Sequence, residues 1–111
     1  MKIFVDIDET ICETPESRDY SLATPIIDNI NKINDLYDEG HEIVYWTARG
    51  SLTGQDWMDL TVKQFKEWGV KYHDLKMGKP FYDIFIDDRA INSNQYFQNN
   101  KNDKDVKWDW T

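Results

Sequence analysis

Lys2-Ile3-Phe4-Val5-Asp6-Ile7-Asp8-Glu9-Thr10 is the stretch that decides the fold, because an apolar run there ends in two carboxylates. Side chains alternate between the two faces of a strand, so Asp6 and Asp8 share one face while Ile7 turns into the core. Two carboxylates this close repel each other unless a positive charge lies beside them. A magnesium ion with oxygen ligands would supply that charge. A lone D-x-D is more often a strand that ends in solvated acids, so the interpretation depends on the rest of the chain.

The composition limits the class of protein. The chain has 111 residues, 40% of them apolar, and a formal charge of −8, which suits one small domain. No apolar run reaches the length of a membrane span, and the first residues form a strand pattern instead of a signal peptide. A single Cys12 excludes an internal disulfide and fits a reducing compartment, so we expect a cytoplasmic protein. The acidic surface disfavours nucleic-acid partners, whose phosphates it would repel.

Strand and helix patterns alternate along the chain, which predicts an α/β fold. Helical connections between strands are right-handed and make the sheet parallel, so all the strand C-termini meet at one edge. After the first strand, the expected elements in chain order are a loop at 11–23, a helix at 24–40, a strand at 42–46, a helix at 56–68, strands at 70–75 and 81–86, and a short helix at 90–98.

Both long helices have an apolar stripe and clear end signals. Thr24 is a good N-cap, Pro25 fits the first helical position, and Gly40 is expected to end the first helix. Apolar residues at helical spacing predict that one face of each helix lies on the sheet. These residues are Ile26, Ile30, Ile33 and Tyr37, with Ile27 and Leu36, in the first helix, and Met58, Val62 and Phe65 in the second.

Polar residues follow each of three predicted strands. Ligands of open α/β sheets bind at the edge where the strands end, so these residues are candidates for one site. They are Asp6 and Asp8 after the first strand, Thr47, Ala48 and Arg49 after the second, and Asp87, Asp88 and Arg89 after the last, with Lys79 in the loop before it.

The chain resembles the haloacid dehalogenase superfamily of phosphatases, because it has residues like the four motifs of that superfamily in the same order. These residues are Asp6-Ile7-Asp8-Glu9-Thr10, Thr47, Lys79 and Asp87-Asp88. The resemblance covers residues 1 to about 92 and implies a catalytic core over 1–98. It implies a single Rossmann-like, three-layer α/β domain with a mainly parallel sheet of strand order 3-2-1-4, a fifth strand being left open. The family usually has Gly where this chain has Glu9.

The resemblance also implies roles for the acidic residues. Asp6 would attack phosphorus and form an aspartyl-phosphate. Asp8 would protonate the leaving alkoxide and later deprotonate the attacking water. A magnesium ion would be held by the carboxylate of Asp6, the backbone carbonyl of Asp8, and Asp87 or Asp88, with the choice between the last two left open.

The phosphate-binding residues implied by the resemblance are Thr47, with Ala48 and Arg49, and Lys79. Thr47 would donate a hydrogen bond to a phosphoryl oxygen, and Lys79 would neutralise charge on the transferred group. Arg49 and Arg89 have no secure motif role. Either could bind the substrate or pair with an acid.

The spacing of the motifs leaves no room for a cap domain, because the core elements fill residues 11–46 and 48–78. In the family, such open sites act on bulky substrates or are covered by a neighbouring subunit. The acidic surface argues against bulky polynucleotide ends as substrates. We therefore expect the substrate to be a small phosphorylated metabolite such as a sugar phosphate, and we expect a homo-oligomer that covers the site. The chain resembles small phosphatases of phospho-sugar and surface-polysaccharide biosynthesis.

Other functions stay open. A nucleotidase or a polynucleotide-end phosphatase would use the same motifs, although the acidic surface disfavours the second. A receiver-like domain fits poorly, because its adjacent acidic pair ends the first strand, whereas here that pair comes late. A non-catalytic phosphate-binding module would have no need of Asp8 or Lys79.

The tail at 99–111 could be an edge strand or an oligomer contact. His41 and His73 lack nearby Cys ligands, so no zinc site is expected.

Overall fold

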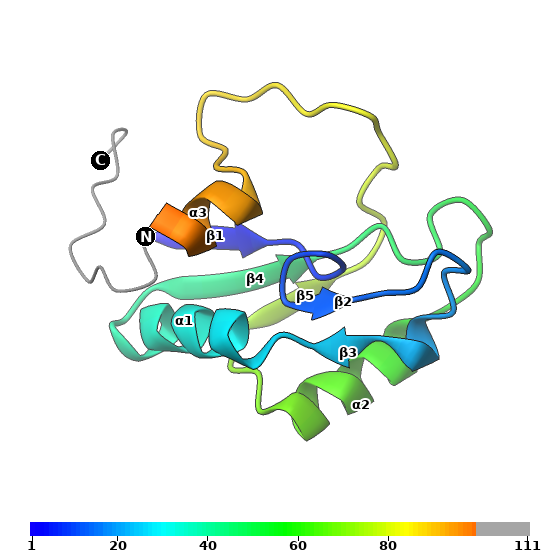
Figure 1. Cartoon of the computed structure of the whole chain (residues 1–111), viewed down its shortest axis with the longest axis horizontal. Coiled ribbons are helices and arrows are strands. Elements are labelled where there is room, and N and C mark those ends of the chain that lie inside the picture. The colour runs from blue at the N-terminus through cyan, green and yellow to red at the C-terminus, as the bar shows by residue number, and fades with distance from the viewer. Residues whose placement is uncertain (100–111) are drawn as a thin grey trace. The chain divides into compact units, whose positions relative to one another are not determined.

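A parallel sheet of three strands forms the centre of the first unit of the protein (Figure 1). The computed structural model describes residues 1–99, which divide into one unit at 1–81 and a second at 82–99, each described by itself. The strands are β1 (Lys2–Val5), β4 (Glu42–Trp46) and β5 (Asp74–Lys76), in the order β1-β4-β5. Both pairings are parallel, as the alternation of strands and helices predicts.

The middle strand, β4, supplies much of the core. Its residues Ile43, Val44 and Tyr45 are each at most 1% exposed. A strand that is buried on both faces is expected to be continuously apolar, and the bounds predicted for this strand are confirmed. The other two strands are shorter than predicted. After β1 the chain turns at once, since Thr10 and Ile11 both donate their backbone N–H to the carbonyl of Ile7.

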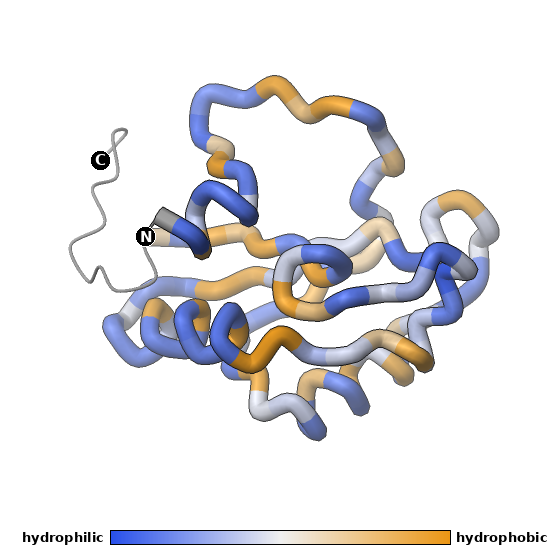
Figure 2. Tube along the Cα trace, in the orientation of Figure 1, coloured by the Kyte–Doolittle hydropathy of each residue, from blue (hydrophilic) through white to orange (hydrophobic). Residues whose placement is uncertain are grey.

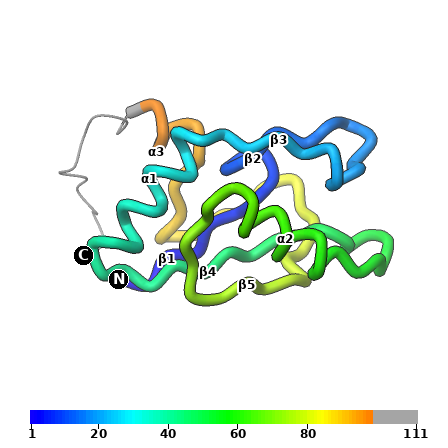
Figure 3. The backbone as a smooth tube through the Cα atoms, turned by 90° about the horizontal axis from the view of Figure 1, so that it is seen from below, coloured from blue at the N-terminus to red at the C-terminus, as the bar shows by residue number. Residues whose placement is uncertain are grey.

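Helices α1 (Ile27–Asp38) and α2 (Met58–Trp68) lie on the same face of the sheet, as the views in Figures 1 and 3 agree. Two right-handed crossovers that step in the same direction across a sheet require this arrangement. The first unit therefore has two layers, a sheet and a helical layer, and the expected third layer is not part of it. In α2, the buried Phe65 packs on Tyr45 of β4 with ring centroids 4.9 Å apart.

The predicted start of the first helix is wrong. Thr24 and Pro25 form the short strand β3 (Thr24–Pro25), which pairs antiparallel with β2 (Cys12–Glu13). The N–H of Ile26 donates to the carbonyl of Ile11 at 2.8 Å, so the extended backbone continues to the helix start. The local capping signal of Thr24 is thus overridden by pairing with a distant segment. The end of the helix near Gly40, whose φ is +99°, agrees with the prediction.

The buried faces of the two helices follow the predicted stripes only in part. In α1, Ile30, Ile33 and Leu36 are buried, whereas Ile27 is 51% exposed. In α2, Val62 is 43% exposed, and the polar residues Thr61 and Gln64 are buried beside Phe65. The inward face of α2 is therefore rotated toward two polar side chains, which belong to the candidate site described below.

The predicted strand at 81–86 is wrong, because the described structure has no strand there. Hydrophobic residues recur along this segment, which leads toward α3 (Ser93–Asn99) (Figure 2). Ile84 and Ile86 are 78% and 94% exposed. A strand needs a partner for its backbone N–H and C=O groups, and an apolar run alone does not provide one. Of the predicted strand order 3-2-1-4, the part 3-2-1 agrees with β5, β4 and β1, and the fourth strand is missing from the described residues. The short helix predicted at 90–98 begins later, at Ser93.

The described residues contain no inserted cap. Within residues 11–46 and 48–78 the chain forms only the strands β4 and β5 of the sheet, the two helices, the β2–β3 pair and the 3-10 turn η1 (Tyr20–Leu22). Among residues 1–99, no helix has the length and apolar character needed to cross a bilayer. The predictions for the polar tail lie outside the described residues, except that Asn99 ends α3.

Candidate active site

Asp6 and Lys79 meet at the C-terminal edge of the sheet. Lys79 Nζ lies 3.5 Å from Asp6 Oδ2, and the lysine side chain is only 14% exposed. The backbone N–H of Lys79 donates to the carbonyl of Thr47 at 3.0 Å, which fixes the lysine loop to the end of β4. The structure thus brings together candidates from three of the four sequence motifs. This is the juxtaposition that parallel strands predict.

The Asp6 carboxylate is held in a partly dehydrated place. Burial raises its pKa, as does the neighbouring charge of Asp8, whereas Lys79 and the N–H of Ile7 lower it. That N–H donates to Asp6 Oδ1 at 2.8 Å. A carboxylate whose ionised form is disfavoured by dehydration gains from a further positive charge, and that a magnesium ion supplies this charge at Asp6 stays a prediction.

Asp8 is held by an arginine from the loop that follows the neighbouring strand β4. Arg49 Nε donates to Asp8 Oδ2 at 3.0 Å, and Arg49 Nη2 donates to Asp8 Oδ1 at 2.9 Å. This bidentate pair is the strongest geometry for an arginine–carboxylate contact. The arginine side chain is fully buried and the aspartate side chain is 15% exposed.

Every N–H of the Arg49 guanidinium has a protein partner. Two are used on Asp8, and Nη1 donates to Thr61 Oγ1 at 3.0 Å and to Gln64 Oε1 at 2.6 Å. The fifth N–H, on Nη2, is directed to Cys12 Sγ at 3.8 Å. A guanidinium has five N–H donors, so none is left for a phosphate. Our expectation that Arg49 binds substrate phosphate therefore needs correction, and its alternative as a partner of an acid fits the geometry.

Thr47 and Ala48 lie where β4 ends. Thr47 is 1% exposed, and its Oγ1 accepts the backbone N–H of Arg49 at 3.1 Å, so it also shapes the loop. The Ala48 carbonyl accepts the N–H of Ser51 at 2.9 Å, which closes a turn. Their hydroxyl and amide groups stand at the same strand end as the Lys79 loop.

The late acidic pair belongs to the second unit. Within that unit, Asp87 Oδ1 accepts the N–H of Arg89 at 3.3 Å, and Asp88 Oδ2 lies 4.0 Å from Arg89 Nε. Among the described residues, no three His, Cys, Asp or Glu side chains gather closely enough to hold a metal. That Asp87 or Asp88 shares a cation with Asp6 and Asp8 stays a prediction.

Glu9 has a left-handed backbone, with a φ of +61°. Its N–H donates to the carbonyl of Cys12 at 2.8 Å and closes the loop that follows Asp8. Gly adopts this conformation without strain, whereas a residue with a Cβ such as Glu9 does not. The Glu9 side chain is exposed and pairs with Arg18, whose Nη1 lies 3.0 Å from Glu9 Oε1.

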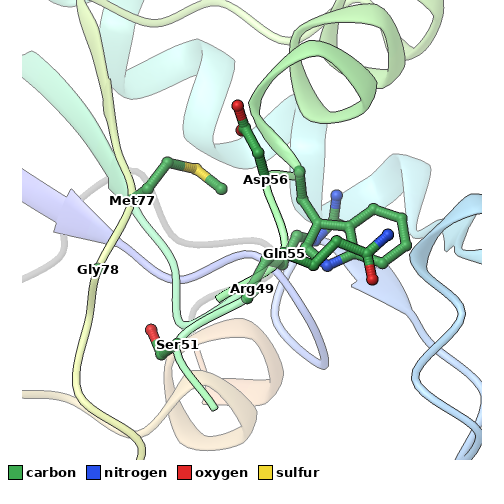
Figure 4. A pocket seen from close by; sticks show the side chains of 8 residues that line it. Arg49, Ser51, Gln55, Asp56, Met77 and Gly78 are labelled. Carbon is green, nitrogen blue, oxygen red and sulfur yellow. The ribbon is translucent and has the colours of Figure 1, made fainter. Parts of the chain in front are cut away.

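A pocket of about 150 Å³ opens beside Arg49, between the loop that follows β4 and the loop that precedes Lys79 (Figure 4). Figure 4 shows the side chain of Met77 extending from one loop toward Asp56 on the other. Ser51 Oγ donates to the carbonyl of Lys79 at 2.7 Å and so joins the two loops. The lining residues are Arg49, Gly50, Ser51, Gln55, Asp56, Trp57, Met77 and Gly78.

The sequence interpretation missed the partners that surround the Asp8–Arg49 pair. Thr14 Oγ1 donates to Asp8 Oδ1, and Thr61 and Gln64 bind the arginine from α2. Thr61 and Gln64 are three residues apart and so share one helix face next to Phe65, but this spacing alone does not indicate that the face is buried. Cys12 is also in this group, and burial followed by the charge of Asp8 raises its pKa to about 12.

Comparison with known proteins supports the fold. No protein-family model and no curated protein matches the chain. A solved structure, the crystal structure of an MCSG target from Vibrio cholerae, is similar with a TM-score of 0.77 and 26% sequence identity. The similarity covers 86% of this chain and 85% of that chain. It agrees with a small α/β domain with a mainly parallel sheet, and the name of that protein states no activity.

The left-handed backbone at Glu9 predicts an order of stability for three variants. A non-Gly residue there costs about 1–2 kcal/mol, and a β-branched residue costs more. We expect Glu9→Gly to have a higher free energy of unfolding than Glu9→Gln, and Glu9→Val a lower one. Glu9→Gln is the control, because it removes the charge pair with Arg18 and leaves the backbone cost. Urea unfolding measures all three, and equal values for Val and Gln would contradict the left-handed conformation.

Gly50 and Gly54 form a matched pair in the pocket loop. Both have positive φ, +81° and +74°, but a Cβ at Gly50 would lie 2.1 Å from the carbonyl oxygen of Gln55, whereas one at Gly54 meets no atom within 4 Å. We expect Gly50→Ala to be less stable than Gly54→Ala by about 1–3 kcal/mol, because a backbone atom must move. Urea unfolding of both variants measures the difference, and equal stabilities would contradict the tight turn.

Proposed function

We propose that this protein is a magnesium-dependent phosphomonoester hydrolase that works through an aspartyl-phosphate on Asp6. The observation that carries the proposal is the contact of Lys79 Nζ with Asp6 Oδ2 at 3.5 Å, next to a second acid, Asp8, at the edge where ligands of parallel sheets bind. A nucleophilic carboxylate needs a nearby cation and an acid–base partner, and both are present. The resemblance to haloacid dehalogenase phosphatases supports the same roles.

The chemistry assigned to the acids has two steps. In the first, a carboxylate oxygen of Asp6 forms a bond to phosphorus, the bond from phosphorus to the leaving oxygen breaks, and Asp8, which enters this step in its protonated form, gives that oxygen a proton. In the second, Asp8, now ionised and paired with Arg49, takes a proton from water, the water oxygen attacks phosphorus, and the bond to Asp6 breaks, which restores the protonated Asp8 of the first step. Such acid–base assistance contributes about 10²–10⁴ in rate. When bound, magnesium would supply positive charge beside the transferred phosphoryl group, with Asp6 and the backbone carbonyl of Asp8 as its expected ligands.

The phosphoryl group is assigned to donors from the two strand ends. Lys79 supplies a positive charge, and the Thr47 hydroxyl and the Ala48 N–H supply hydrogen bonds. Arg49 is left out of this set, because its donors are used within the protein.

The organic part of the substrate is assigned to the pocket beside Arg49, which the loop preceding Lys79 also lines. Trp57 and Met77 offer apolar surface, while Gln55 and Asp56 offer an amide and a carboxylate. A sugar presents both C–H faces and hydroxyl groups, so a sugar phosphate fits this mixed lining. The absence of an inserted cap between the described elements is consistent with a site that a second copy of the chain covers.

The test is phosphate release from a panel of phosphorylated compounds, with magnesium and with a chelator. The panel contains hexose, heptose and keto-acid sugar phosphates, nucleotides and a 3′-phosphorylated oligonucleotide. We expect turnover of a sugar phosphate that needs magnesium, and a loss of more than about a thousandfold in Asp6→Asn. Asp59→Asn, which removes an exposed acid from α2, is the matched control and should keep wild-type activity.

Three results would contradict the proposal: no turnover of any compound by the folded protein with magnesium, turnover that the chelator leaves unchanged, or equal activity of Asp6→Asn and Asp59→Asn. Preference for a nucleotide or for the oligonucleotide would support the phosphatase activity but contradict the assignment of a sugar phosphate as the substrate.

A further inference from the structure

We propose that Arg49 is a positioning residue that holds Asp8 so that Oδ2 is the oxygen that exchanges the proton with the leaving group. This inference rests on the proposed function. Arg49 touches neither phosphate nor leaving group in it, since its donors are used within the protein. It acts through Asp8 alone.

The two carboxylate oxygens of Asp8 differ in their surroundings. Oδ1 accepts hydrogen bonds from Arg49 Nη2 and from Thr14 Oγ1, and the thiol of Cys12 lies 3.5 Å away. Among the described residues, Oδ2 accepts one hydrogen bond, from Arg49 Nε at 3.0 Å. A carboxylate oxygen can accept two, so Oδ2 keeps a lone pair open and Oδ1 does not. The proton exchange therefore belongs to Oδ2.

The guanidinium is itself held in one orientation. Thr61 Oγ1 accepts from Arg49 and donates to the carbonyl of Trp57 at 2.8 Å. Gln64 accepts from Arg49 through Oε1 and donates through Nε2 to the carbonyl of Tyr20 at 2.7 Å. The centroid of the Tyr20 ring lies 4.9 Å from Arg49 Cζ, within the range of a cation–π contact. Helix α2 and the η1 turn thus fix the plane of the guanidinium.

This arrangement requires an arginine. A lysine keeps the charge, but it is a point donor and cannot bind both oxygens of Asp8 while it also binds Thr61 and Gln64. In Arg49→Lys the carboxylate is free to rotate about its terminal bond, so Oδ2 is no longer held toward the leaving oxygen. General acid catalysis depends on such positioning to within about an ångström.

The consequence is a dependence on the leaving group. When an alkyl phosphate reacts, the oxygen released as the P–O bond breaks is a strongly basic alkoxide, and it needs the proton of Asp8. When p-nitrophenyl phosphate reacts, the leaving phenolate is stable without a proton. The ratio kcat/KM covers the steps up to departure of the leaving group, so the later attack of water does not affect this comparison.

The experiment measures kcat/KM for p-nitrophenyl phosphate and for the alkyl phosphate that the wild type turns over best. We expect Arg49→Lys to lower the alkyl value at least about tenfold more than the aryl value, in the same direction as Asp8→Asn. Gln64→Leu leaves both Arg49–Asp8 contacts in place and removes one outer contact. It should shift the ratio in the same direction by a smaller factor.

An equal loss on both substrates in Arg49→Lys, or an unchanged ratio, would overturn the positioning role and leave Arg49 with a structural one. Circular dichroism and urea unfolding show whether Arg49→Lys folds. If it does not fold, Gln64→Leu decides: a shifted ratio supports the inference and an unshifted ratio overturns it. Failure of the proposed function is a different result, because the wild type would then turn over neither substrate.

Discussion

The buried Arg49–Asp8 ion pair is the interaction on which the site depends. Both groups lose hydration when they leave water, and this cost is offset only when the geometry is good and the other donors and acceptors are satisfied. Here all five N–H groups of the guanidinium have partners: two on Asp8, two on helix α2 and one on Cys12. Removing one partner of such a pair typically costs about 3–5 kcal/mol, because the other charge is left buried.

The pair also bears on how so acidic a protein would bind the phosphate anion that we propose as its substrate. The chain has a formal charge of −8, which repels phosphate at long range. At the sheet edge, however, Asp8 is neutralised by Arg49, and Asp6 lies beside Lys79. The local charge therefore differs from the net charge, and a cation at Asp6 would shift it further toward positive.

The sequence predicted the parts of the fold that depend on local patterns. The bounds of β4 were predicted fully, because a continuous apolar run between polar ends has one good interpretation. The predicted end of the second helix at residue 68 is confirmed, because Gly69 follows it in the left-handed conformation, with a φ of +70°, that commonly ends a helix. Thr24 and Pro25 misled the prediction of α1, since pairing of their segment with Cys12 and Glu13 outweighs a capping preference. The run at 81–86 looks like a strand, yet its sequence does not specify a partner strand.

The same division applies to the candidate site. Asp6, Thr47 and Lys79 could be predicted to meet, because the rules of parallel sheets bring strand ends to one edge. The role of Arg49 could not be predicted, since the sequence does not tell which polar side chains of α2 face inward. Thr61 and Gln64 occupy the places that a hydrophobic stripe would assign to apolar residues, and together they determine what Arg49 can bind.

The central claim is that Asp6 carries the phosphoryl group while Asp8 handles protons. The most direct measurement is mass spectrometry of Asp8→Asn, quenched with acid during turnover of p-nitrophenyl phosphate, with Asp6→Asn as the control. A phosphoryl group on Asp6 that hydroxylamine removes is predicted, because the leaving group departs unaided while the attack of water lacks its base. Turnover with no phosphorylated peptide, or with the phosphoryl group on another residue, would contradict the account.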